Sequence, residues 1–234
     1  MKFGAVISLV LAWPGLAAGQ QVRLVLQLVE LPHATVTQWT TGKALPGREI
    51  HERAMKLAAT GEAEIVETCV LVARSGERAL VESIAELIYP TEYDPSSPPN
   101  AVAQGLVDGN FPAFRYLRPA DVITNSFETR NTGSTLEIEP MVGRGGTMVD
   151  LRISFEMVDR AGLATFTEFR DPWGDGSSRM PIFDTREMTG SITLTSGVFE
   201  LWNIFNPKPA AVPAVTTRMM VFVCADVLPT HEMK

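Results

Sequence analysis

The residues that could support catalysis or metal binding are scattered along the sequence. His33, His51 and His231 are the only histidines, and none has a metal-ligand spacing such as H-E-x-x-H. No serine lies in a G-x-S-x-G nucleophile elbow. The glycine-rich run 143–146 is not followed by a Lys-Ser/Thr pair, so a phosphate-binding loop is not indicated. A Ser-His-Asp site built from distant positions would be recognised only by its geometry. The sequence therefore predicts a non-catalytic protein, with no cofactor and no metal.

Two cysteines, Cys69 and Cys224, each lie in a predicted strand. An exported chain would permit them to form a disulfide, provided that the two strands lie close together. Two buried free thiols are the alternative. The sequence leaves both readings open.

One short segment is a candidate for recognition of a partner, because it combines aromatic residues with a proline-rich stretch that follows it. Aromatic side chains on a rigid support are typical of protein interfaces. The alternative is that Tyr89 and Tyr93 only pin the following loop to the core. The candidate interface residues are Tyr89, Pro90, Thr91, Glu92 and Tyr93.

The composition indicates a globular domain with an acidic surface. The 234 residues are 45% hydrophobic and 20% charged, which is enough apolar material for a sizeable core. The net charge is −7 and no basic run is present, so nucleic-acid binding is not expected.

The first residues have the composition of a secretory signal peptide. Lys2 precedes an apolar run, 3–16, which is followed by small residues at 17–19. We expect cleavage after Gly19, and an uncleaved anchor is the alternative. No later stretch reaches about 18 uninterrupted apolar residues, so no transmembrane segment is predicted. The protein is therefore expected to be exported, to the periplasm or to an association with the outer membrane.

The periodicity of apolar residues predicts a mainly β (α+β) fold of antiparallel sheets or a sandwich, with one or two N-terminal helices. A single domain is expected over 20–234, with an irregular loop at about 95–120. The best-defined helix has apolar residues at helical spacing and ends before Gly61, a residue suited to a C-terminal cap. We predict helices at 35–41 and 48–59, and strands at 22–31, 63–73 (central in its sheet), 78–89, 135–142, 148–155, 187–194 and 217–228.

The stretch from Phe127 to Phe155 indicates a β-hairpin. Apolar residues alternate with polar ones from Leu136 to Val142 and again from Val149 to Phe155, around the glycine-rich run 143–146. Such alternation is typical of an antiparallel pair with one face on a core and one face in water.

The hairpin contains the run Arg-x-x-Gly-x-Thr-Leu-Glu-x-x-Pro-x-Val, from Arg130 to Val142. This run resembles the sequence of the secretin domain found in type II and type III secretion systems and in type IV pilus systems. The similarity extends to neighbouring segments, including a Tyr-Pro step at the end of one strand and a Pro-x-Phe-x-Thr-Arg run before another. The run 91–95 is similar to secretin-like proteins of the Verrucomicrobia. The residues that carry the resemblance are Arg130, Gly133, Thr135, Leu136, Glu137, Pro140 and Val142, with Gly76, Ala79, Tyr89, Pro90 and the segment 180–186.

The resemblance implies a component or assembly partner of a type IV pilus or type II secretion machine, with a full-length secretin or further copies of itself as partners. The stretch 198–216 is too short for two strands that cross a membrane, and it contains three prolines. The resemblance therefore implies a truncated secretin domain that lacks the pore region. A free-standing adhesive or ligand-binding β-domain is the alternative function, and a hydrolase with an unrecognised site is a third hypothesis.

Overall fold

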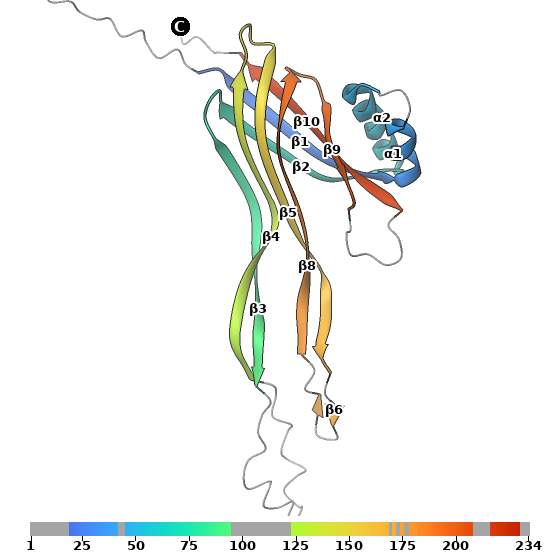
Figure 1. Cartoon of the computed structure of the whole chain (residues 1–234), viewed down its shortest axis with the longest axis vertical. Coiled ribbons are helices and arrows are strands. Elements are labelled where there is room, and N and C mark those ends of the chain that lie inside the picture. The colour runs from blue at the N-terminus through green and yellow to red at the C-terminus, as the bar shows by residue number, and fades with distance from the viewer. Residues whose placement is uncertain are drawn as a thin grey trace, which may run out of the picture.

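The computed structural model describes residues 19–41, 45–94, 123–168, 170–171, 174–175, 178–207 and 216–229. The predicted loop at about 95–120, and all of the predicted signal peptide except Gly19, lie outside these residues. The described part consists of two four-stranded antiparallel sheets, a small two-stranded sheet and a pair of helices (Figure 1).

Sheet A has the strand order β2-β1-β10-β9, and all of its pairings are antiparallel. The two apolar, alternating segments near the ends of the chain form its centre, where Gln21 pairs with Leu228 and Pro32 with Thr217. The four strands are β1 (Gln21–Pro32), β2 (Glu64–Arg74), β9 (Glu200–Phe205) and β10 (Thr217–Leu228).

Sheet B has the order β3-β4-β5-β8 and contains the longest strands of the structure. Each is joined to its neighbour in antiparallel register. The strands are β3 (Ala79–Asp94), β4 (Ile123–Val142), β5 (Met148–Thr167) and β8 (Ser178–Thr195), and two short strands, β6 (Arg170–Asp171) and β7 (Gly174–Asp175), pair with each other between β5 and β8.

The main core lies where the two sheets pack face to face. Leu24 and Leu26 of β1 and Val221 and Val223 of β10 are fully buried there. The predicted hairpin is confirmed as β4 and β5, since every second residue faces this core. Its buried side chains are Leu136, Ile138, Val149, Leu151, Ile153 and Phe155.

A second, smaller core lies between the opposite face of sheet A and the helices α1 (His33–Thr40) and α2 (Gly47–Thr60). Val36 and Trp39 of α1 and Ile50 of α2 pack there on Phe222 of β10. Gly61 ends α2 with a left-handed φ of 81°, as the sequence predicted for a C-terminal cap.

The predicted fold class is confirmed, but two details differ. The strand predicted at 63–73 was expected to be central, but β2 is an edge strand whose Val70 and Val72 are exposed. The strand predicted at 148–155 continues as β5 to Thr167. Sheet B therefore contains strands of 16 to 20 residues, longer than the sequence indicated.

Candidate interaction surface

The described histidines do not form a catalytic or metal site. His51 of α2 stacks on Phe199, with ring centroids 3.8 Å apart, and contacts the edge of Phe222. Its Nε2 lies 2.8 Å from Oε1 of Gln27 on sheet A. Burial lowers the pKa of His51, so the neutral imidazole is favoured in the folded protein. His51 therefore serves to pack α2 on the sheet. Among the described residues, no group of three His, Cys, Asp or Glu side chains could hold a metal ion.

The structure describes Cys69 and Cys224 as free thiols, which is the second of the two readings that the sequence left open. Cys69 of β2 pairs across the ladder with Leu26, whereas Cys224 of β10 pairs with Val25. Leu26 and Val25 are neighbours on β1, and neighbouring residues of a strand point to opposite faces. The thiols are therefore separated both by β1 and by the thickness of the sheet.

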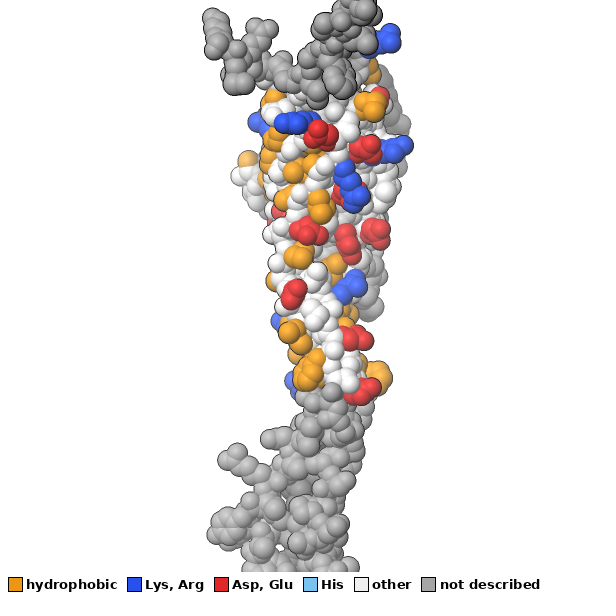
Figure 2. All heavy atoms as spheres, turned by 90° about the vertical axis from the view of Figure 1, so that its left-hand side faces the viewer, with side chains coloured by type: hydrophobic (Ala, Val, Ile, Leu, Met, Phe, Trp, Pro, Cys, Tyr) orange, Lys and Arg blue, Asp and Glu red, His pale blue; other side chains and the backbone are white. Residues whose placement is uncertain are grey.

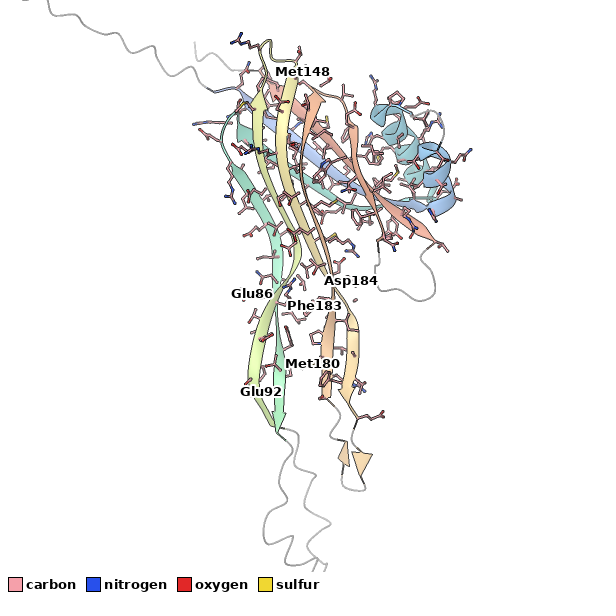
Figure 3. The ribbon with its side chains drawn as sticks, viewed as in Figure 1. Glu86, Glu92, Met148, Met180, Phe183 and Asp184 are labelled. Carbon is pink, nitrogen blue, oxygen red and sulfur yellow. The ribbon has the colours of Figure 1, made fainter. Side chains whose placement is uncertain are left out.

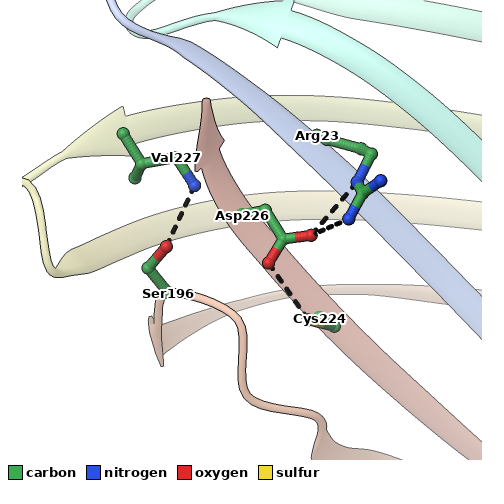
Figure 4. Close-up of polar contacts among 5 residues, drawn as sticks. All are labelled: Arg23, Ser196, Cys224, Asp226 and Val227. Atoms are coloured by element: carbon green, nitrogen blue, oxygen red, sulfur yellow. Dashed lines mark hydrogen bonds and ion pairs between the residues drawn. The ribbon is translucent and has the colours of Figure 1, made fainter. Parts of the chain in front are cut away.

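Cys224 lies beside an ion pair at one end of sheet A (Figure 4). Nε and Nη2 of Arg23 donate to Oδ2 of Asp226, at 3.1 and 2.5 Å. The thiol of Cys224 lies 4.0 Å from the other carboxylate oxygen. Burial and the Asp226 charge raise the pKa of Cys224 from 9.0 to about 11. The thiol is therefore protonated at neutral pH.

We expect Cys224 to react slowly with thiol reagents in the native protein. A pKa of about 11 in place of 9.0 lowers the thiolate fraction at pH 8 about a hundredfold. Native protein incubated with iodoacetamide should keep an unmodified Cys224, whereas protein unfolded in urea without reductant should be alkylated at both cysteines. Peptide mass spectrometry would measure this. Recovery of a linked Cys69–Cys224 peptide would contradict the structure.

The outward face of sheet B is polar and rich in carboxylates. Arg78 pairs with Glu137, and Arg152 lies 3.7 Å from Glu139. Glu156 and Glu187 stand directly opposite each other on β5 and β8, an arrangement that is unfavourable between like charges. A hollow of about 440 Å³ lies on this face, lined mainly by ion-paired and hydroxyl side chains. It has the character of a solvated surface.

Sheet B presents two long edge strands, β3 and β8. No described strand pairs with the outer side of either one. Apolar side chains follow the β3 edge, with Leu80, Ile84 and Ile88 exposed by 50%, 43% and 65%. Figure 2 views the side of the molecule on which the upper part of β3 lies, where hydrophobic and charged side chains are interspersed. Long, exposed strand edges with apolar side chains are templates for pairing with another chain.

The candidate interface segment lies on this edge strand. Pro90 is opposite Phe127 on β4, the ladder is irregular between Pro90 and Glu92, and Ser126 donates to a Glu92 carboxylate oxygen at 2.9 Å. The irregularity falls at Thr91, and the backbone of Tyr93 pairs with Thr124.

Tyr89 makes its contacts within the chain. Its hydroxyl donates to Oε2 of Glu128 at 3.2 Å, and its ring lies 5.7 Å from that of Phe183 on β8. Tyr89 therefore pins the distal part of β3 to another strand. The candidate segment as a whole remains a proposed interface.

Sheet B divides into two arms. The β4–β5 ladder ends at the pair Gly133–Val158, although both strands continue beyond it. We call the β3–β4 hairpin below this point (84–94 and 123–132) the first arm, and the β5–β8 hairpin below it (159–167 and 178–185) the second arm. A cleft of about 530 Å³ lies at the division, lined by Ile84, Arg130, Gly133, Glu156 and Val158 among others.

The arms are twisted so that β3 and β8 face each other, while β4 and β5 lie on the outer sides (Figure 1). Besides the Tyr89–Phe183 contact, Nη2 of Arg130 donates to the hydroxyl of Thr185 at 3.3 Å. Figure 3 labels Phe183 and Asp184 on the second arm, where it approaches the first.

Sequence reasoning located Tyr89 but missed Phe183 and the division of sheet B. Phe183 belongs to the quoted segment 180–186, in which it was only part of a motif. The weak alternation from Leu80 to Ile88, with glutamates between the apolar residues, was a signal of an exposed edge.

The fold is that of an antiparallel two-sheet protein with a helical pair on one side and long edge strands. No protein-family model matches the sequence, and no curated protein matches it. Solved structures of secretins are similar to this chain.

Three of these secretins illustrate the likeness. ExeD of Aeromonas hydrophila is 14% identical, with a TM-score of 0.44 over 91% of this chain and 49% of the ExeD chain. The secretin domain of InvG from the Salmonella SPI-1 injectisome is 8% identical, with a TM-score of 0.48 over 92% of this chain and 65% of the other. PilQ, the competence pilus secretin of V. cholerae, is 8% identical, with a TM-score of 0.43 over 91% and 62%.

This chain thus spans about half the length of ExeD. In the described residues, no helix is long and apolar enough to cross a membrane.

Proposed function

We propose that this chain is an exported, non-catalytic, secretin-like component or assembly partner of a type IV pilus or type II secretion machine. It would act in the periplasm or at the outer membrane, by pairing its sheet edges with further copies of itself or with a full-length secretin. The observation that carries the proposal is the pair of long edge strands, β3 and β8, on opposite sides of sheet B. The resemblance of the β4–β5 hairpin sequence to that of the secretin domain supports the proposal.

The directions of these strands suit assembly of successive copies. Three antiparallel pairings separate β3 from β8, so the two edges run in opposite directions. A rotation about an axis parallel to the strands would bring β3 of one copy beside β8 of the next without reversing either strand. Sheet B would then continue from copy to copy as an antiparallel sheet. Such head-to-tail contacts close into rings or extend as filaments.

The lengths and side chains of the edges favour the same pairing. β3 has 16 residues and β8 has 18, so the two can match over most of their length. Ile84 and Ile88 on β3 and Ile182 on β8 are exposed in the single chain. Pairing would remove these apolar groups from water and would supply partners for the unpaired backbone groups of both edges.

The first test is the mass of the purified mature protein by light scattering, alone and with the secretin encoded by the same genome. We expect a ring-sized oligomer or a stable complex. Ile84→Lys combined with Ile88→Lys should shift the protein to the monomer, because a charged side chain on an edge opposes pairing.

Met141→Lys provides a matched control, since Met141 is 57% exposed on the inner strand β4 near the Gly143 turn. It should leave the mass unchanged. A wild-type protein that stays monomeric and ignores the secretin would overturn the proposed function. The adhesive or ligand-binding domain would then be the better explanation.

A further inference from the structure

The two edges proposed for assembly are also the two that meet inside one molecule. Beyond Gly133 each arm consists of only two strands, and two-stranded ribbons twist more strongly than wider sheets. This twist turns β3 and β8 toward each other, so that the distal part of each edge faces the other (Figure 1). The contacts between the two arms include the Tyr89–Phe183 ring pair, which joins β3 to β8, and the hydrogen bond from Arg130 of β4 to Thr185 of β8.

An isolated two-stranded hairpin is only marginally stable in water. Each arm also carries large apolar side chains that are mostly exposed, such as Ile88 and Phe127 on the first arm and Leu163 and Phe166 on the second. The arms therefore gain from any contact that holds them together, and the inter-arm contacts provide one. The ring pair joins centroids 5.7 Å apart at an interplanar angle of 51°, within the range of favourable aromatic pairs.

We propose that the contact of Tyr89 with Phe183 is an autoinhibitory latch, which holds β3 against β8 of the same chain and keeps both distal edges from pairing with another copy. This inference rests on the proposed function. Opening of the latch lets the arms untwist, so that β3 and β8 can pair with neighbouring copies over their whole length. The upper parts of both edges stay accessible in the latched state, which makes them the place where a neighbouring copy binds first.

The strand directions are the same in the latch and in the proposed contact between two copies. β3 and β8 run antiparallel within one molecule, as they would between two copies. The intramolecular contact is made by side chains, and no described backbone ladder joins the two strands. Pairing with a neighbour adds the backbone hydrogen bonds that the latch lacks, so assembly can displace the latch.

The test compares Phe183→Ala with Phe127→Ala in the full mature protein. Both changes remove an aromatic ring from an arm, but Phe127 is 58% exposed on β4 and is not part of the latch. Two measurements are made: the rate of oligomer formation by light scattering after dilution from mild denaturant, and amide hydrogen exchange at a concentration where the protein is monomeric.

Phe183→Ala should assemble about two- to tenfold faster than wild type, the range that corresponds to loss of one aromatic pair. In the monomer, its peptides covering 86–92 and 179–185 should exchange faster than those of wild type. Phe127→Ala should match wild type in both measurements.

Equal assembly rates for the two variants would overturn the latch. So would unchanged exchange in the arms of Phe183→Ala. If exchange rises in Phe183→Ala while neither wild type nor variant ever assembles, the arm contact exists but the proposed function and its inhibition are both wrong. If wild type assembles and Phe183→Ala assembles more slowly, the proposed function stands and the contact is instead part of the assembled state.

Discussion

Gly133→Ala is expected to lower the free energy of unfolding by about 3 kcal/mol or more, because the backbone at this position is strained for any other residue. Gly133 has a φ of 119°, which side-chain-bearing residues rarely adopt. A Cβ at this position would also overlap the carbonyl oxygen of Ser83 on β3 and lie 3.1 Å from Cα of Ile84. These are backbone atoms of a paired strand, so they cannot move aside without disturbing the β3–β4 ladder.

Urea unfolding of the purified variant measures this effect. Gly162→Ala is the matched control, because Gly162 also lies in sheet B but has no atom within 4 Å of an added Cβ and no positive φ. It should change stability by less than about 1 kcal/mol. A Gly133→Ala variant as stable as Gly162→Ala would contradict the positive φ and the close approach to Ser83 that the structure describes at Gly133. Since Gly133 lies where the arms separate, the substitution should destabilise the arms before it destabilises the packing between the two sheets.

Phe222→Ala is expected to cost about 3 to 5 kcal/mol, the range for removing a buried phenylalanine. Phe222 of β10 is fully buried and is the largest of the sheet A side chains in the core beneath the helical pair. Its ring also contacts the edge of the His51 imidazole, with centroids 5.1 Å apart. The substitution should therefore destabilise the packing of α1 and α2 first, while the core between the sheets is retained.

Hydrogen exchange separates these two regions. Peptides from 33–40 and 47–60 should lose protection in Phe222→Ala, and peptides from 149–155 should keep it. Phe166→Ala is the control, since Phe166 is exposed and its removal should leave stability unchanged. Equal loss of protection in helices and hairpin would mean that the helical pair is not a separate layer but unfolds together with the sandwich.

Local periodicity was sufficient for the elements whose alternation is strong. β1, β10 and the upper half of the β4–β5 hairpin bury every second residue or nearly every residue, and the sequence shows both patterns. The distal half of β5 was missed because the register shifts between Arg160 and Gly162, which breaks the alternation. A bulge of this kind depends on the partner strand and leaves little local signal.

The edges and the latch could not be predicted, because they depend on strand order. β2 was read as central from its apolar residues, yet Val70 and Val72 lie on an exposed edge strand. Likewise, nothing near Tyr89 in the sequence identifies Phe183 as its neighbour, since the contact joins two hairpins through the twist of both. Long-range pairing of this kind is a property of the whole fold.

The pairing of β1 with β10 has a consequence for how the protein is made. β1 and β10 are the two central strands of sheet A, and Gln21 pairs with Leu228. This sheet therefore cannot form until β10 has been synthesised. Contacts between such distant parts of a chain form slowly, since the loop between them must be ordered first. A chain built in this way lacks its central sheet during synthesis, and for the export proposed above this would suit passage across a membrane as an extended polypeptide. Sheet A would then form only after export, when β1 and β10 are both present on the same side of the membrane.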